Sequence, residues 1–153
     1  MANKERMFNG PQPQGTLFLK VPVADATAFE KGDFVALASN LGIKVSSVAD
    51  AGDAAANRAA GAAVFIGVAL DAKVANDGAT HIMVAANGLM WLDQKTAAAI
   101  GFGDEVEIYA SDAACEVQTI VAGSTSAIGI CMETHDDTVT ETLVLIQPAL
   151  ANV

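Results

Sequence analysis

The side chains best suited to chemistry in this chain are two histidines, His81 and His135, and two cysteines, Cys115 and Cys131. His81 lies in an alternating apolar and polar segment, where a single histidine is more often a surface or core residue than a ligand. His135 lies in the acidic stretch 133–137, whose carboxylates could bind a divalent cation but lack the spacing of a calcium loop. Both cysteines have apolar, strand-like surroundings without Cys-x-x-Cys spacing. The sequence therefore favours buried free thiols and a solvated acidic turn over a metal site, with a single disulfide left open.

Motifs for a nucleophile or a phosphate are also missing from the sequence. Ser124 and Ser126 lie in a plain Gly-Ser-Thr-Ser loop, without the Gly-x-Ser-x-Gly that presents a catalytic serine. Gly101 and Gly103 resemble half of a dinucleotide-binding fingerprint but lead into a predicted strand instead of a helix. Charged residues are only 17% of the chain, so few groups are at hand for catalysis. We expect a protein that is not an enzyme and binds no cofactor.

Charge is distributed unevenly along the chain. The formal net charge is -10; residues 1–95 contain all eight Lys and Arg and nine acidic residues, whereas residues 96–153 contain nine acidic residues and no basic one. Because nucleic-acid binding needs Lys and Arg against the phosphates, we expect no nucleic-acid partner. The acidic half is interpreted as a solubilising surface, with an acidic binding patch as the alternative. The basic residues near the start, Lys4, Arg6 and Lys20, could dock on an acidic neighbour.

Residues 1–15 are predicted to form a flexible arm, because Pro11 and Pro13 oppose a helix and few apolar groups could anchor it. This stretch is polar and lacks the apolar core of a signal peptide. The longest apolar stretch, residues 59–70, is too short to cross a bilayer. We therefore expect a soluble protein made in the cytoplasm, with no membrane partner.

Residues 16–153 are predicted to form one β-rich domain that folds as a compact barrel or sandwich. Short runs rich in Val and Ile alternate with turn residues. Asn87 and Gly88 are expected to form a tight hairpin, because both central residues of such a turn need positive φ. Two short helices are expected, at 50–60 with an Asp50 or Asp53 cap and at 96–100. The expected strands are 16–23, 33–38, 43–48, 62–70, 80–85, 89–92, 105–110, 115–121, 127–133 and 141–147.

An internal repeat is the most informative feature of the sequence. Three matched pairs of segments keep the same order: 32–37 with 103–108, 66–71 with 128–133, and 80–84 with 142–146. The fold is therefore predicted to consist of two related β-units, at about 16–87 and 88–148, that bury their apolar faces together. The Ala-rich segment 49–61 would account for the extra length of the first unit. The alternative is chance recurrence of short apolar motifs in Ala- and Val-rich sequence.

Trp91 is the only tryptophan of the chain. It lies in the apolar run Leu-Met-Trp-Leu at 89–92, so packing in the core is the favoured interpretation. The alternative is an interface anchor, since Trp is enriched at binding hot spots.

The segments 88–95, 103–108, 128–133 and 143–146 together resemble a family of tailed-bacteriophage head proteins, the capsid decoration or cement proteins. The likeness is one of pattern over roughly residues 16–148, and the long arm and the Ala-rich insert depart from the shorter members. The resemblance implies a viral structural protein without an active site, which binds the outer surface of the phage capsid and stabilises the head. It also implies the phage major capsid protein as partner, a homo-oligomer with a trimer favoured, and a place on the capsid surface of the virion.

The arm and the first predicted strand are the expected capsid-binding segments. The arm would lie along a capsid-protein surface, and the strand would pair with a sheet edge until Pro22, which lacks an N–H. The alternative is a disordered arm and an ordinary core strand. The expected contact residues are Lys4, Arg6, Phe8, Leu17, Phe18 and Leu19.

Other functions remain open from the sequence. Another virion part, such as a head fibre base or a tail-tube or baseplate module, is the second hypothesis. A small enzyme or metal-binding domain is the third. A carbohydrate-binding domain is the fourth, although such domains use several Trp or Tyr and aromatic residues are only 5% of this chain.

Overall fold

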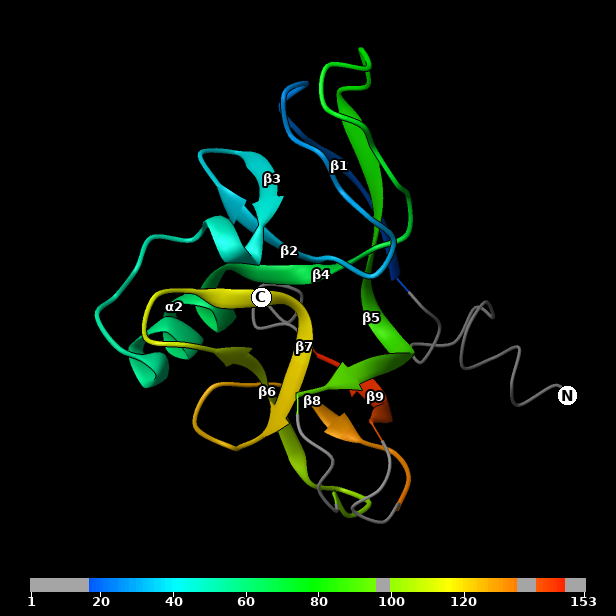
Figure 1. Ribbon diagram of the computed structural model, residues 1–153. Coiled ribbons are helices and arrows are strands. Elements are labelled where there is room, and N and C mark those ends of the chain that lie inside the picture. The colour runs from blue at the N-terminus through cyan, green and yellow to red at the C-terminus, as the bar shows by residue number, and fades with distance from the viewer. Residues whose placement is uncertain (1–16, 96–99, 135–139, 148–153) are drawn as a thin grey trace, which may run out of the picture.

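The computed structural model describes residues 17–95, 100–134 and 140–147, which form two β-units that share one long strand (Figure 1). The first unit contains β1 (Leu17–Pro22), β2 (Phe34–Ala38), β3 (Leu41–Lys44) and β4 (Phe65–Ala69). The second unit contains β6 (Glu105–Ala110), β7 (Cys115–Ala122), β8 (Ala127–Cys131) and β9 (Glu141–Ile146). Strand β5 (His81–Gln94) runs through both units. The prediction of a mostly β fold is confirmed.

The two units have the same strand pairing, and each closes on itself. In the first unit the order is β1-β5-β4-β2-β3, and a parallel bridge between Val23 and Gly42 links the end of β1 to β3. In the second unit β5 takes the place of β1, and the order is β5-β9-β8-β6-β7. A parallel pairing of Asp93 with Thr119 then joins β7 to β5. The sheet therefore consists of two related, barrel-like units, which is the arrangement that the repeat predicts.

The long strand β5 corrects one prediction, because Asn87 and Gly88 do not form a hairpin. Gly88 does have a positive φ, of 123°, but the chain continues through it within β5. Both ends of the strand have partners: β1 pairs with it as far as Asn87, and β9 pairs with it from Gly88 onward. The positive φ of Gly88 therefore occurs where β5 crosses from the first unit into the second, and the chain does not reverse there.

A glycine in the same place of each unit explains the second segment match. Gly67 in β4 and Gly129 in β8 lie next to a bulge in their own strands, where Ile66 and Ile128 have no partner in β2 and β6. Gly67 has a φ of 147°, and a Cβ there would strike the carbonyl oxygen of Ala85. A Cβ on Gly129 would lie 2.6 Å from the carbonyl oxygen of Leu145. Glycine therefore allows the neighbouring strand to approach closely in both units.

The Gly-Asp pair just before β2 and β6 forms the same turn in both units. Gly32 and Gly103 have φ values of 93° and 90°. The carboxylates of Asp33 and Asp104 each accept a hydrogen bond from the backbone N–H three residues earlier, at 2.8 Å and 2.7 Å. The first segment match therefore reflects a shared turn geometry.

The third segment match is wrong by two residues. Val68 pairs with Ala85, and the equivalent Ile130 pairs with Leu145. Strands β5 and β9 therefore correspond at an offset of 60 residues instead of 62. Because side chains alternate with a period of two, a shift of two residues keeps every side chain on the same face and leaves the pattern unchanged.

The Ala-rich insert forms the helix α2 (Ala54–Val64), between β3 and β4. Asp53 caps it, as predicted, by accepting a hydrogen bond from the N–H of Ala56 at 2.8 Å. The helix does not stop at Gly61, which is buried where a Cβ would lie 2.7 Å from the Cys115 sulfur. Close packing against β7 is therefore the reason for this glycine.

Two predicted strands are shortened accordingly. The strand expected at 62–70 begins at Phe65, because residues before it belong to α2. The strand expected at 43–48 ends early in the short 3-10 helix η1 (Val45–Ser47). The helix expected at 96–100 and the arm at 1–15 lie outside the described residues, apart from Ile100.

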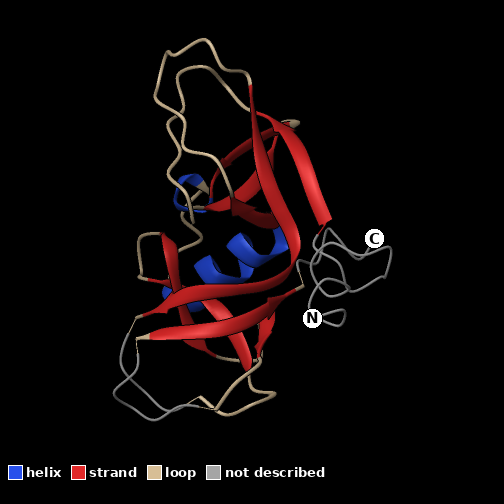
Figure 2. Ribbon diagram, turned by 90° about the vertical axis from the view of Figure 1, so that its right-hand side faces the viewer, coloured by secondary structure: helices blue, strands red, loops and turns tan. Residues whose placement is uncertain are grey.

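The buried apolar side chains form two clusters. One lies in the first unit and includes Val21, Val35 and Val84. The larger cluster fills the second unit and extends into the first, where the rings of Phe34 and Phe65 meet edge to face at 5.7 Å. Figure 2 shows α2 lying between the strands of the two units. The helix therefore helps to bury the junction between the units.

Candidate interaction surface

The groups with reactive potential do not gather into a site among the described residues. Cys115 and Cys131 are free and buried, as the sequence predicts. Their thiols donate hydrogen bonds to the carbonyl oxygens of Asn57 at 3.1 Å and Glu133 at 2.8 Å. Burial raises the pKa of both thiols, so both stay protonated at neutral pH and are poor nucleophiles.

The other candidate residues are scattered. His81 is exposed at the start of β5, with its Nδ1 3.0 Å from the hydroxyl of Thr80. Within residues 17–95, 100–134 and 140–147, no three His, Cys, Asp or Glu side chains are placed to hold a metal ion. His135, Asp136 and Asp137 lie outside these residues.

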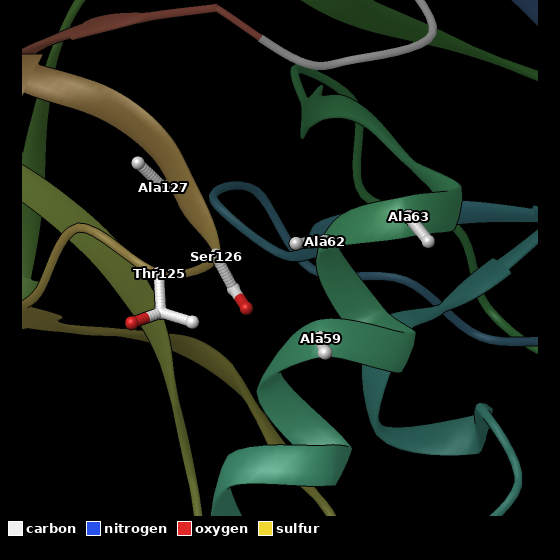
Figure 3. A pocket seen from close by; sticks show the side chains of 6 residues that line it. All are labelled: Ala59, Ala62, Ala63, Thr125, Ser126 and Ala127. Atoms are coloured by element: carbon white, nitrogen blue, oxygen red, sulfur yellow. The ribbon is translucent and has the colours of Figure 1, made fainter.

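A shallow hollow of about 300 Å³ lies between α2 and the turn that joins β7 to β8 (Figure 3). Its lining is made of small side chains: Ala59, Ala62, Ala63, Thr125, Ser126 and Ala127. The side chain of Ser126 points toward α2, and no acid or base is among the lining residues. The hollow therefore offers no activated nucleophile, although it includes Ser126 of the Gly-Ser-Thr-Ser loop.

An ion pair between Arg58 and the buried carboxylate of Glu107 lies near this hollow and was not predicted from the sequence. Glu107 in β6 accepts hydrogen bonds from the N–H of Ser126 at 2.8 Å and from Nη1 of Arg58 at 3.3 Å. Its side chain is only 5% exposed. The Glu107 carboxylate therefore links α2 to the β7–β8 turn. Glu107 and Arg58 are too far apart in the sequence for a local pattern to pair them.

The first strand has both an exposed and a buried portion. Leu17 and Phe18 are 45% and 49% exposed, and Leu19 is half-buried. Val21, further along β1, is buried, and the whole strand pairs with β5 as far as Pro22. The strand thus belongs to the core at its end and to the surface at its beginning. The other expected contact residues, Lys4, Arg6 and Phe8, lie outside the described residues.

Trp91 lies on the outside of the second unit, so the expectation that it packs in the core is wrong. Its side chain is 60% exposed. Leu92, the next residue, is buried, because successive side chains of a strand point to opposite faces. Trp91 pairs with Leu143 of β9, and the neighbouring row consists of Leu89, Leu145 and Ile130.

Together these five residues form a surface that we call the Trp91 face. All except Trp91 itself are half-buried. An apolar surface of several adjacent side chains is the kind of feature that marks an interaction site on a folded chain. The sequence signal for it was present in β9, where the apolar residues outnumber those that one buried face requires.

Carboxylates border the Trp91 face on one side. Asp93 and Glu141 are directly opposite each other in the pairing of β5 with β9, and both are exposed. Glu133 is close by, with its carboxylate 3.4 Å from the N–H of Leu143. Like charges directly opposite on neighbouring strands are unfavourable, and a cationic partner would relieve them.

No protein-family model matches the chain, and a search of curated proteins finds no match either. In the part of the chain that the structure describes, no helix is long and apolar enough to cross a membrane.

Proposed function

We propose that this chain is a decoration protein of a tailed-phage head. In this proposal it binds the outer surface of the capsid, stabilises the head, and resides on the virion after synthesis in the host cytoplasm. The partner is the major capsid protein, and the decoration protein acts as a homo-oligomer, with a trimer favoured. The pattern resemblance of the sequence and the β-rich, two-unit fold support this proposal.

The observation that carries the proposal is the exposure of Leu17 and Phe18 at the beginning of β1. Large apolar side chains on a strand that begins a folded unit are available to a partner without any unfolding of the core. They directly follow the segment that contains Lys4, Arg6 and Phe8. Basic and apolar groups are thus adjacent in the chain, which suits docking on an acidic, partly apolar shell surface.

Co-sedimentation with undecorated heads, assembled from the major capsid protein of the same genome, tests the proposal. We expect saturable binding near one copy per capsid-protein subunit and a higher melting temperature of the head. A double variant, Leu17→Ser with Phe18→Ser, should bind at least tenfold more weakly. The matched control is Leu37→Ser with Leu41→Ser, since these two side chains are exposed to a similar extent (38% and 37%) on the β2–β3 hairpin.

Absence of binding to heads, with both variants folded as judged by circular dichroism, would remove the proposal. Binding to tail assemblies instead would assign the chain to a tail-tube or baseplate module. Equal loss of binding in the β1 variant and the hairpin control would show that β1 is not the docking strand.

A further inference from the structure

The Trp91 face corresponds to a face of the first unit that is less apolar and is buried only in part. The strand pairing makes Leu145 equivalent to Ala85, and Ile130 equivalent to Val68. Ala85 and Val68 are buried within the chain, whereas Leu145 and Ile130 are only half-buried and Trp91 is exposed. The counterparts of Leu145 and Ile130 are therefore covered in the first unit, whereas the counterparts of Trp91 and Leu89, which are Lys20 and Phe18, are exposed.

The border of the face selects among possible occupants. Asp93 and Glu141 add two exposed carboxylates at its edge, and Glu133 adds a third nearby. An exposed Trp attracts cations to its ring face, and paired carboxylates suit a guanidinium. The chemistry of the surface therefore fits a segment that is both basic and apolar.

The position of β1 points to the source of such a segment. The N–H of Leu17 donates a hydrogen bond to the Asn87 side chain at 2.9 Å, and β1 runs antiparallel to β5. Going backward from Leu17, the chain therefore heads in the direction in which β5 continues toward Trp91. The four residues from Asn87 to Trp91 span about 13 Å of strand. Sixteen extended residues reach as far as roughly 50 Å, so residues 1–16 are long enough.

The composition of residues 1–16 matches the face. The segment contains Lys4, Arg6, Met7 and Phe8, with Glu5 as its single acidic side chain. We propose that residues 1–16 bind the Trp91 face of their own chain in the free protein. Arg6 and Lys4 then approach the carboxylates while Phe8 covers the apolar surface. This inference concerns the free protein and does not depend on binding to a capsid. If the proposed function also holds, a shell surface competes with the Trp91 face for the same segment.

Because Trp91 is the only tryptophan, its fluorescence reports on the face directly. The experiment uses the full chain and measures quenching of Trp91 by acrylamide, a neutral quencher, at low salt. The variant Lys4→Glu with Arg6→Glu should raise the quenching constant at least twofold, and Phe8→Ala should raise it as well. Adding Asp93→Lys and Glu141→Lys to the charge-reversed arm should restore protection, because the opposite charges are then exchanged.

The matched control reverses two exposed carboxylates away from the face, Glu30→Lys with Asp112→Lys, and should leave the quenching constant unchanged. Equal quenching in the wild type and in the arm variants would overturn the proposal. So would protection that appears only as protein concentration and solution mass rise together, since the segment would then come from a second copy. Head binding is measured separately, so either result can fail while the other stands.

Discussion

The two units share one backbone plan but present different surfaces. In both, a Gly-Asp turn precedes a strand, a glycine lies beside a bulge in its own strand, and a parallel pairing closes the unit. At the bulge, however, the first unit has the buried Ala36 where the second has Glu107. On the outer face the first unit has Lys20 where the second has Trp91.

The comparison separates positions that stabilise the fold from positions that are available to bind a partner. The positions that agree between the units are those where the backbone allows only glycine or needs a local hydrogen-bond acceptor. Of the positions that differ, Ala36 and Glu107 are buried, whereas Lys20 and Trp91 lie on the outside of the strands, where packing imposes less. The second unit presents an apolar face bordered by acidic residues, and this is where we place the binding of residues 1–16.

The largest effect is expected at the bulge glycines, because the neighbouring strand leaves no room for a side chain. Gly67→Ala should lower the free energy of unfolding by roughly 3 kcal/mol or more, since it adds backbone strain at a φ of 147° to a steric clash. Gly129→Ala, which lacks the positive φ, should cost about 1–3 kcal/mol. Urea unfolding measures both. Equal losses would show that backbone strain is not what distinguishes the two glycines.

The buried Lys73 connects two loops of the first unit through its side-chain ammonium group. The Nζ of Lys73 donates hydrogen bonds to the carbonyl oxygens of Asp25 at 2.7 Å and Val74 at 3.1 Å, and lies 3.0 Å from the Asp77 carboxylate. Lys73→Met should lower the free energy of unfolding by about 2 kcal/mol, because it leaves these acceptors without their donor. The control is Lys31→Met at an exposed lysine of the same unit, which should be nearly neutral.

The same lysine makes the stability of these loops sensitive to acid. Its hydrogen bond holds the pKa of Asp77 below the ordinary 3.8. A carboxylate whose pKa is lowered by folding contributes stability above its unfolded pKa, and this contribution is lost as the pH falls through the folded value. Stability measured below pH 3.8 should therefore fall less steeply in Lys73→Met than in the wild type. Parallel curves would contradict the pairing.

In the second unit, the Glu107 carboxylate should contribute to the free energy of unfolding through its hydrogen bonds, which its counterpart Ala36 cannot form. Glu107→Ala leaves Arg58 and the N–H of Ser126 without their acceptor, which should cost about 1–2 kcal/mol. Replacing Arg58 by Ala in that background should cost little more, because its partner is already gone. A double-mutant cycle measured by thermal unfolding tests this, and additive losses would argue against a functional pair.

The smallest effect on stability is expected at Trp91. In the Lys4→Glu, Arg6→Glu background, where residues 1–16 are expected not to bind the face, Trp91→Ser should change the free energy of unfolding by less than about 0.5 kcal/mol, because the side chain is then exposed. Leu92→Ala, one residue further along β5, should cost about 2–5 kcal/mol, since Leu92 is in the core. A large loss in Trp91→Ser would mean that Trp91 supports the fold and would weaken its assignment to a binding face.

Local features of the sequence determined much of this fold. Alternating apolar residues located β6 and β7 almost to the residue, because that pattern reflects one buried face of each strand. Asp53 marked the start of α2, since a helix cap is a contact between near neighbours in the chain. The repeat was visible because Gly-Asp and Ile-Gly mark backbone geometries that few other residues adopt.

Only the tertiary structure decided the features that depend on distant partners. The chain passes straight through Asn87 and Gly88 because β1 and β9 supply partners on either side, although the dipeptide alone favours a hairpin. Trp91 is exposed because Leu92 and its neighbours fill the inside of the second unit, so the face it lies on follows from pairing with β9. Glu107 meets Arg58 across 49 residues of sequence. Local pattern cannot specify such contacts, because they arise only when separate segments are brought together by the closure of each unit.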